Sequence, residues 1–150
     1  MRIHVRSKSQ VECGDVPDAP HVIVSIYTLE SDRANTLKCK NAVDVLYQGF
    51  ADLERLPALG SATEAYFEGV PIVLFGRKHA REIKAFVQRH LKEGIEDIVF
   101  QCEMGISRSA GLAAAFAEHY LGDATAYLAK EGCRPNPRVH SCMLRMLGYK

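Results

Sequence analysis

The chain carries the sequence IVFQCEMGISRSAGLAAA at residues 98–115. It starts with an apolar run of strand length, continues through polar residues around a glycine, and ends with small apolar residues. This pattern predicts a buried strand, a tight loop and a buried helix. The backbone N–H groups at the start of such a helix converge on one point, and the helix dipole adds positive potential there. The loop is therefore expected to bind an anion.

Two side chains give the predicted loop its chemistry. Cys102 stands at its start and Arg108 at its end. The thiolate is the nucleophilic form of cysteine, and a helix N-terminus or a cationic neighbour favours it. A guanidinium can donate two parallel hydrogen bonds to a tetrahedral oxyanion, whereas lysine acts as a point charge. We therefore predict a nucleophile inside an anion site; the alternative is a buried thiol beside an unrelated surface arginine.

Two further residues suit a backbone that curls around an anion. Gly105 can adopt a positive φ, which such a curve usually requires. Ser109, at the predicted start of the helix, can hydrogen-bond the sulfur or cap an exposed amide. The spacing of cysteine and arginine, the glycine between them and the serine after them together favour the nucleophilic interpretation.

Residues 102–109 resemble the C-x5-R-S signature of the cysteine-dependent protein tyrosine and dual-specificity phosphatases, most closely the compact bacterial and phage type. The resemblance runs from about Val22 to Leu147 and is weak before residue 20. It implies one phosphatase domain over residues 1–150, with an α/β fold in which helices flank a central, largely parallel sheet of four to five strands. The alternation of predicted strands and helices favours the same fold class.

The resemblance also implies roles for the residues of the loop. Cys102 would form a phosphocysteine intermediate, and Ser109 would help the thiolate to leave in the second step. The Arg108 side chain and the loop amides would hold the phosphate oxygens. These amides belong to Glu103, Met104, Gly105, Ile106, Ser107 and Arg108.

A general acid on a separate loop is a further implication of the resemblance. The segment Gly49-Phe50-Ala51-Asp52-Leu53 follows a predicted strand and is similar to the F-x-D segment that holds the acid in the bacterial and phage relatives. Asp52 would then lie just past a strand end, within reach of a site built at the carboxyl ends of parallel strands. The alternatives are that Asp52 is an ordinary solvated carboxylate, or that Asp44, inside the strand pattern, is the acid.

Two features depart from the family pattern. Gln101 occupies the position before the nucleophile, where the family usually has a histidine. Glutamine cannot carry a positive charge, so weaker stabilisation of the thiolate and a slower reaction are expected. The segment between Asp52 and the helix predicted from Lys78 is also long, which predicts an acid loop of a different shape.

Composition restricts the remaining classes of function. The chain has 150 residues and 47% hydrophobic content, enough for one domain with a real core. A net charge of +1 gives no reason to expect nucleic acid as a partner. The sequence shows no signal-peptide pattern and no apolar run of membrane-spanning length. Five cysteines without a C-x-x-C pair favour a reducing cytoplasm, and the dispersed histidines predict no metal and no cofactor.

The sequence pattern predicts further regular elements on both sides of the loop. Strands are expected at residues 2–6, 21–27 and 43–47, and helices at residues 78–92, 124–131 and 138–147. Gly94 and Gly122 are expected to end helices, and Asp123 to cap one.

The expected function is removal of phosphate from phosphotyrosine in a protein or peptide, with phosphoserine and phosphothreonine as further candidates. Glu103 on the rim of the site disfavours polyanionic substrates. Two alternatives remain open at this point. One is a weak or inactive pseudophosphatase that only binds phosphorylated partners, and the other is a phosphatase of small phosphoesters.

Overall fold

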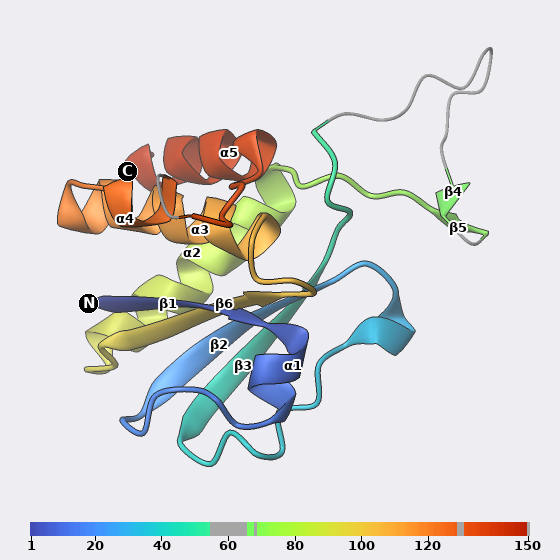
Figure 1. Cartoon of the computed structure of the whole chain (residues 1–150). Coiled ribbons are helices and arrows are strands. Elements are labelled where there is room, and N and C mark those ends of the chain that lie inside the picture. Colours follow the sequence, from blue (N-terminus) through green and yellow to red (C-terminus); the bar gives the residue numbers. More distant parts are fainter. Residues whose placement is uncertain (55–65, 68, 129–130, 150) are drawn as a thin grey trace.

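A four-stranded parallel sheet forms the centre of the protein, with the strand order β1-β6-β2-β3 (Figure 1). The computed structural model describes residues 1–54, 66–67, 69–128 and 131–149. The strands are β1 (Arg2–Ser7), β2 (His21–Tyr27), β3 (Ala42–Gly49) and β6 (Asp97–Cys102). The two central strands, β2 and β6, are almost completely buried, which explains their nearly continuous apolar sequence.

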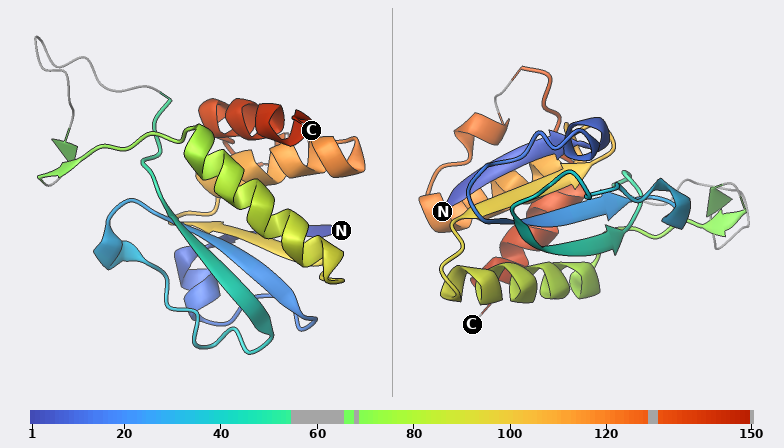
Figure 2. Two further views of the ribbon diagram at one scale, coloured as in Figure 1. Left: turned by 180° about the vertical axis from the view of Figure 1, so that it is seen from behind. Right: turned by 90° about the horizontal axis from the view of Figure 1, so that it is seen from below.

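The longer helices lie together on one face of the sheet (Figures 1 and 2). They are α2 (Arg77–Lys92), α3 (Arg108–Phe116) and α5 (Pro137–Gly148). Every residue of α3 is buried, because this helix lies between strand β6 and helix α5. None of the helices within the described ranges has the length and apolar character needed to cross a membrane.

The opposite face of the sheet is covered by the short helix α1 (Lys8–Glu12) and by loops (Figure 1). A smaller apolar cluster fills this side, with Val11 of α1 packed among Ile23, Cys39 and Val99. Helices therefore flank the sheet, as predicted, but they are unequally distributed between its two faces. Helix α1 has a capping box in which Ser7 and Gln10 bond to each other's backbone amides.

The predicted strands and helices are confirmed with differences at some of their ends, and helix α1 is an element that was not predicted. The helix expected at residues 124–131 is the shorter α4 (Thr125–Leu128) in the described part of the chain, and residues 129–130 of that prediction lie outside it. Asp123 accepts a hydrogen bond from the Thr125 amide and so caps this turn. Between α3 and Gly122 the chain forms a π-helical turn, η2 (Ala117–Leu121), and a 3-10 turn, η1 (Glu30–Asp32), follows β2.

Part of the long segment between Asp52 and α2 contains a small hairpin of β4 (Tyr66–Phe67) and β5 (Val70–Pro71). Residues 55–65 and 68 of this segment lie outside the described residues. All four strands of the central sheet run in the same direction, so their carboxyl ends all lie at one edge of the sheet. That edge is where ligands bind in parallel α/β folds.

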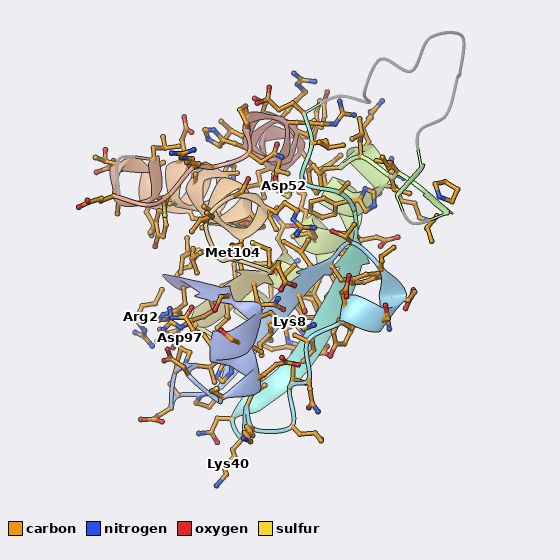
Figure 3. The ribbon with its side chains drawn as sticks, turned by 45° about the vertical axis from the view of Figure 1, so that its right-hand side comes forward. Arg2, Lys8, Lys40, Asp52, Asp97 and Met104 are labelled. Carbon is orange, nitrogen blue, oxygen red and sulfur yellow. The ribbon has the colours of Figure 1, made fainter. Side chains whose placement is uncertain are left out.

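At the opposite end of the sheet, an ion pair between the exposed Arg2 of β1 and the buried Asp97 of β6 joins these strands (Figure 3). The Asp97 carboxylate accepts hydrogen bonds from Arg2 Nε at 2.9 Å and Nη2 at 2.7 Å, and its Oδ1 lies 2.8 Å from His4 Nε2. The Arg2 hydrogen bonds, supported by His4, lower the pKa of Asp97 from 3.8 to about 2. Because the pKa is lower in the folded state, the carboxylate stabilises the fold above its unfolded pKa and loses this effect as the pH falls toward 2.

We expect Asp97→Asn to lower the free energy of unfolding by about 2 kcal/mol at pH 7, and by about half as much near pH 3. Urea denaturation at the two pH values measures the difference. Asp15→Asn is the matched control, because Asp15 is an exposed partner of Arg6 at 3.9 Å and such pairs contribute less than about 1 kcal/mol. An equal loss at both pH values would contradict the assignment of the effect to the ionised carboxylate.

Candidate active site

The loop of residues 103–107 connects the end of β6 to the start of α3, as the sequence predicts. Cys102 is the last residue of β6 and its side chain is buried at the bottom of the loop. Its sulfur lies 3.0 Å from Ser109 Oγ, in the first turn of α3. The structure thus brings the predicted nucleophile and the predicted serine into direct contact.

The backbone of this loop directs its carbonyl groups outward. The carbonyl of Glu103 accepts from the Lys8 amide at 3.1 Å, that of Ile106 from the Arg134 amide at 2.7 Å, and that of Ser107 from the Asn136 amide at 3.0 Å. Among the described backbone hydrogen bonds, none has an N–H of residues 103–107 as its donor. A set of N–H groups left without backbone acceptors around one loop is the arrangement that binds an anion.

Gly105 lets the loop pass very close to the junction of β1 and α1. Its φ is 71°, in the left-handed region, and an added Cβ would lie 2.7 Å from the Ser7 nitrogen. A side chain here would therefore be strained and would also collide with backbone atoms. The sequence predicts the positive φ of this glycine, whereas the close approach to Ser7 is a feature of the tertiary structure.

Arg108 is a buried cation whose described side-chain partners are both neutral. Its Nη1 donates to Thr28 Oγ1 at 2.9 Å and to the Phe50 carbonyl at 2.8 Å. Its Nε is buried and has no hydrogen-bond partner among the described residues. A buried charge and a buried unpaired donor are both unfavourable, and an anion at the loop would satisfy both. We take this as the strongest sign that the site binds an oxyanion.

The structure places Asp52 beside the loop, on the segment that follows β3 (Figure 3). Its Oδ1 accepts hydrogen bonds from Ser107 Oγ at 2.7 Å and from Asn136 Nδ2 at 2.9 Å. The alternative, Asp44, lies elsewhere, because its Oδ2 faces Arg89 and His90 of helix α2. Of the two aspartates considered for the acid, only Asp52 contacts the loop and lines the same cavity as Arg108.

Arg108 is one of the residues that line a cavity of about 470 Å³. Its walls are largely apolar and include Ile26, Ala51, Leu53 and Ile72. The charged groups that line it are Lys8, Asp32, Asp52, Glu103 and Arg108. Apart from Arg108, the charged lining groups are three carboxylates and one ammonium. The cavity therefore combines apolar walls with one guanidinium and a mainly acidic set of other charges.

Gln101, which departs from the family pattern, belongs to a neutral pair inside the sheet. Its side chain is buried, and its Oε1 accepts a hydrogen bond from the Ser25 hydroxyl on β2. This polar pair satisfies two buried groups that would otherwise be unpaired. No cluster of three or more histidine, cysteine or acidic side chains that could hold a metal ion occurs in the described ranges.

Three residues that contribute to this site were not predicted from the sequence. Thr28 and Lys8 follow β2 and β1 directly, but nothing in their local sequence indicates contact with the cavity. Asn136 had a usable signal, because an asparagine followed by proline is a typical helix start. Its contact with Asp52 spans 84 positions of the chain and has no local signature.

No family model matches the chain, and no curated protein matches it in sequence. Solved structures do match in fold. The human tyrosine phosphatase-like serine/threonine/tyrosine-interacting protein aligns with a TM-score of 0.60 and 18% identity, over 97% of this chain and 87% of that one. PTPMT1 aligns with a TM-score of 0.57 and 16% identity, over 97% and 89% of the two chains.

Human DUSP28 is similar to the same extent, with a TM-score of 0.57 and 15% identity over 97% of this chain and 90% of that one. These likenesses cover nearly the whole chain on both sides, so they concern the complete architecture. The protein therefore has the fold of the tyrosine and dual-specificity phosphatases.

Proposed function

We propose that the protein is a cysteine-dependent phosphatase that removes phosphate from phosphotyrosine in proteins or peptides through a phosphocysteine intermediate. The observation that carries this proposal is the buried Arg108 guanidinium, with an unpaired Nε and two neutral partners, at the loop that begins with Cys102. A tetrahedral dianion bound there would pair this cation and accept from the loop amides that lack described backbone acceptors. The fold shared with known phosphatases supports the same reaction class.

In the first step, the Cys102 thiolate attacks phosphorus in line with the leaving oxygen. A sulfur–phosphorus bond forms while the phosphorus–oxygen bond of the ester breaks. Arg108 and the amides of residues 103–108 stabilise the charge on the three equatorial oxygens. Asp52, in its protonated form, gives its proton to the leaving phenolate oxygen.

In the second step, a water molecule attacks the phosphocysteine. Asp52, now a carboxylate, accepts a proton from this water, and the sulfur leaves as a thiolate. Ser109 Oγ lies 3.0 Å from the sulfur, so its hydroxyl can donate a hydrogen bond to the departing thiolate. This step releases inorganic phosphate and restores the initial form of the enzyme.

The cavity favours an aryl phosphate over a polyanion. Its apolar walls match an aromatic ring, and Arg108, which also lines it, matches the phosphate. Asp32, Asp52 and Glu103 outnumber Lys8 around the opening, and like charges repel a second phosphate group. PTPMT1, which shares the fold, has been solved in complex with PI(5)P; we expect a phosphoinositide to be the poorer substrate here.

Phosphate release from three matched substrates tests the proposal: a phosphotyrosine peptide, the same peptide with phosphoserine, and a soluble phosphoinositide. We expect turnover fastest with phosphotyrosine and slowest with the phosphoinositide. Acid quenching during turnover should trap a covalent phosphoenzyme on the peptide that contains Cys102, which mass spectrometry can identify.

A second candidate is a pseudophosphatase that binds a phosphorylated partner without hydrolysing it. The observation that favours it is Asp52 Oδ1, which already accepts two hydrogen bonds within the protein. Saturable binding of the phosphotyrosine peptide with neither phosphate release nor a trapped phosphoenzyme would reject the phosphatase proposal in favour of this one. Release of phosphate from the phosphoinositide alone would reject the assignment of substrate.

A further inference from the structure

Asn136 connects three parts of the site, and each of its polar groups has a partner. It is buried and stands immediately before α5. Its N–H donates to the Ser107 carbonyl at 3.0 Å, and its Oδ1 accepts from the amides of Arg138 at 3.0 Å and Val139 at 3.2 Å. Its Nδ2 donates to Asp52 Oδ1 at 2.9 Å. A single side chain therefore links helix α5 and the carboxylate of the proposed acid.

The helix cap determines which way the Asn136 amide faces. Two backbone N–H groups at the start of α5 need an acceptor, and only the oxygen of the amide group can accept. The nitrogen must therefore point to the other side, which is where Asp52 lies. Because Nδ2 is only a donor, the Asp52 oxygen in front of it must remain an acceptor.

A second donor acts on the same oxygen of Asp52. Ser107 Oγ donates to Oδ1 at 2.7 Å, so two hydrogen bonds hold this oxygen in place. The proton of a carboxylic acid then belongs on Oδ2, which makes no hydrogen bond to the described residues. Asp52 also lines the same cavity as Arg108, where the leaving oxygen of a substrate would lie.

The support behind Asn136 is rigid. The Arg134 amide donates to the Ile106 carbonyl at 2.7 Å, so the segment before α5 is attached to the loop at two successive carbonyls. Pro135 and Pro137 flank Asn136 and restrict the backbone on both sides. Gly111 of α3 allows this close approach, because an added Cβ would lie 3.0 Å from the Asn136 carbonyl.

We propose that Asn136 is a positioning residue for the general acid: by holding Oδ1 of Asp52, it presents Oδ2 and its proton to the leaving oxygen. The inference rests on the proposed phosphatase function and on Asp52 as the acid. It adds a role for a residue that touches neither the phosphate nor the sulfur. It also gives α5 a function beyond packing, since the start of this helix orients the acid.

Asn136→Ser is the decisive variant, because serine also caps helices well but its short side chain cannot reach Asp52. The measurement is kcat/KM for a series of aryl phosphates. The series runs from 4-nitrophenyl phosphate, which has a good leaving group, to phenyl phosphate, whose leaving oxygen must be protonated by the acid. We expect the loss to grow from about threefold to about thirtyfold along the series. A purely structural defect would lower all members equally.

Three further variants make the result specific. Asn136→Asp keeps the cap but replaces the donor by a carboxylate, and should show the same trend. In an Asp52→Asn background, Asn136→Ser should lower kcat/KM little further, because both changes remove the same function. Asn41→Ser, in a distant exposed loop where Asn41 bonds to the Asp18 carbonyl, is the matched control and should behave as the wild type.

The outcomes separate this inference from the proposed function. If Asp52→Asn steepens the dependence on the leaving group and Asn136→Ser does not, the positioning role is wrong and the acid stands. If the wild type fails to hydrolyse any of these esters, or if Asp52→Asn leaves the dependence unchanged, the proposed mechanism itself is wrong. Thermal melting of Asn136→Ser close to that of the wild type is expected, because the cap remains.

Discussion

Replacing Cys102 by serine is expected to lower kcat/KM for 4-nitrophenyl phosphate by about 10⁵-fold. A serine hydroxyl is not ionised at neutral pH, and the described hydrogen-bond partner of the Cys102 sulfur is a serine hydroxyl rather than a base. The variant would therefore have no activated nucleophile. The trapped phosphoenzyme should disappear together with the activity.

The Cys102→Ser protein should still bind phosphate, because Arg108 and the loop amides are unchanged. A phosphotyrosine peptide should raise its melting temperature as it does for the wild type, which shows that the site is intact. Cys13→Ser is the matched control, since Cys13 is an exposed free cysteine outside the site, and it should retain full activity. Vigorous hydrolysis by Cys102→Ser would overturn the nucleophile assignment.

Replacing Arg108 by lysine is expected to lower kcat/KM by about 10³-fold, although the charge is kept. The guanidinium uses Nη1 to bond Thr28 and Phe50 while its Nε stays free for a ligand. An ammonium group has a single nitrogen and cannot keep both anchors and also form two parallel bonds to phosphate. The steady-state rates of wild type and variant with 4-nitrophenyl phosphate measure the effect.

The control for Arg108→Lys is Arg89→Lys on α2, where Arg89 forms a surface ion pair with Asp44 at 3.1 Å. This variant should be fully active, because such pairs contribute little. The melting temperature distinguishes a loss of the site from a loss of the fold. A folded Arg108→Lys protein with wild-type kcat/KM would show that the arrangement of donors on Arg108 is unimportant, and would contradict the proposed phosphate site.

The strand, loop and helix of residues 97–116 could be predicted because their signals are local. The apolar run before Cys102, the glycine at position 105 and the small residues after Ser109 each determine conformation within a few positions. The spacing of Cys102 and Arg108 then indicated an anion site. The position of Asp52 just past a predicted strand end also indicated that it would lie near this loop, since parallel strands end at one edge of the sheet.

Other features of the site depend on contacts between distant parts of the chain. Thr28 and Phe50 anchor Arg108 across 80 and 58 positions, and the close approach of Ser7 to Gly105 requires β1 to pair with β6. Helix α1 was not among the predicted elements, and its place beside the loop follows from the same pairing. Neither the acidic surround of the cavity nor its apolar walls form a continuous sequence pattern.

Local sequence signals specify the main elements and the chemical groups: a thiol, a guanidinium and a curled backbone at one strand end. How these groups are held and paired follows from the tertiary structure. Among the described residues, it leaves the Nε of a buried arginine without a partner, and it sets Asn136 against one oxygen of Asp52. Backbone conformation follows from neighbouring residues, whereas burial and hydrogen-bond partners depend on which distant segments the sheet brings together.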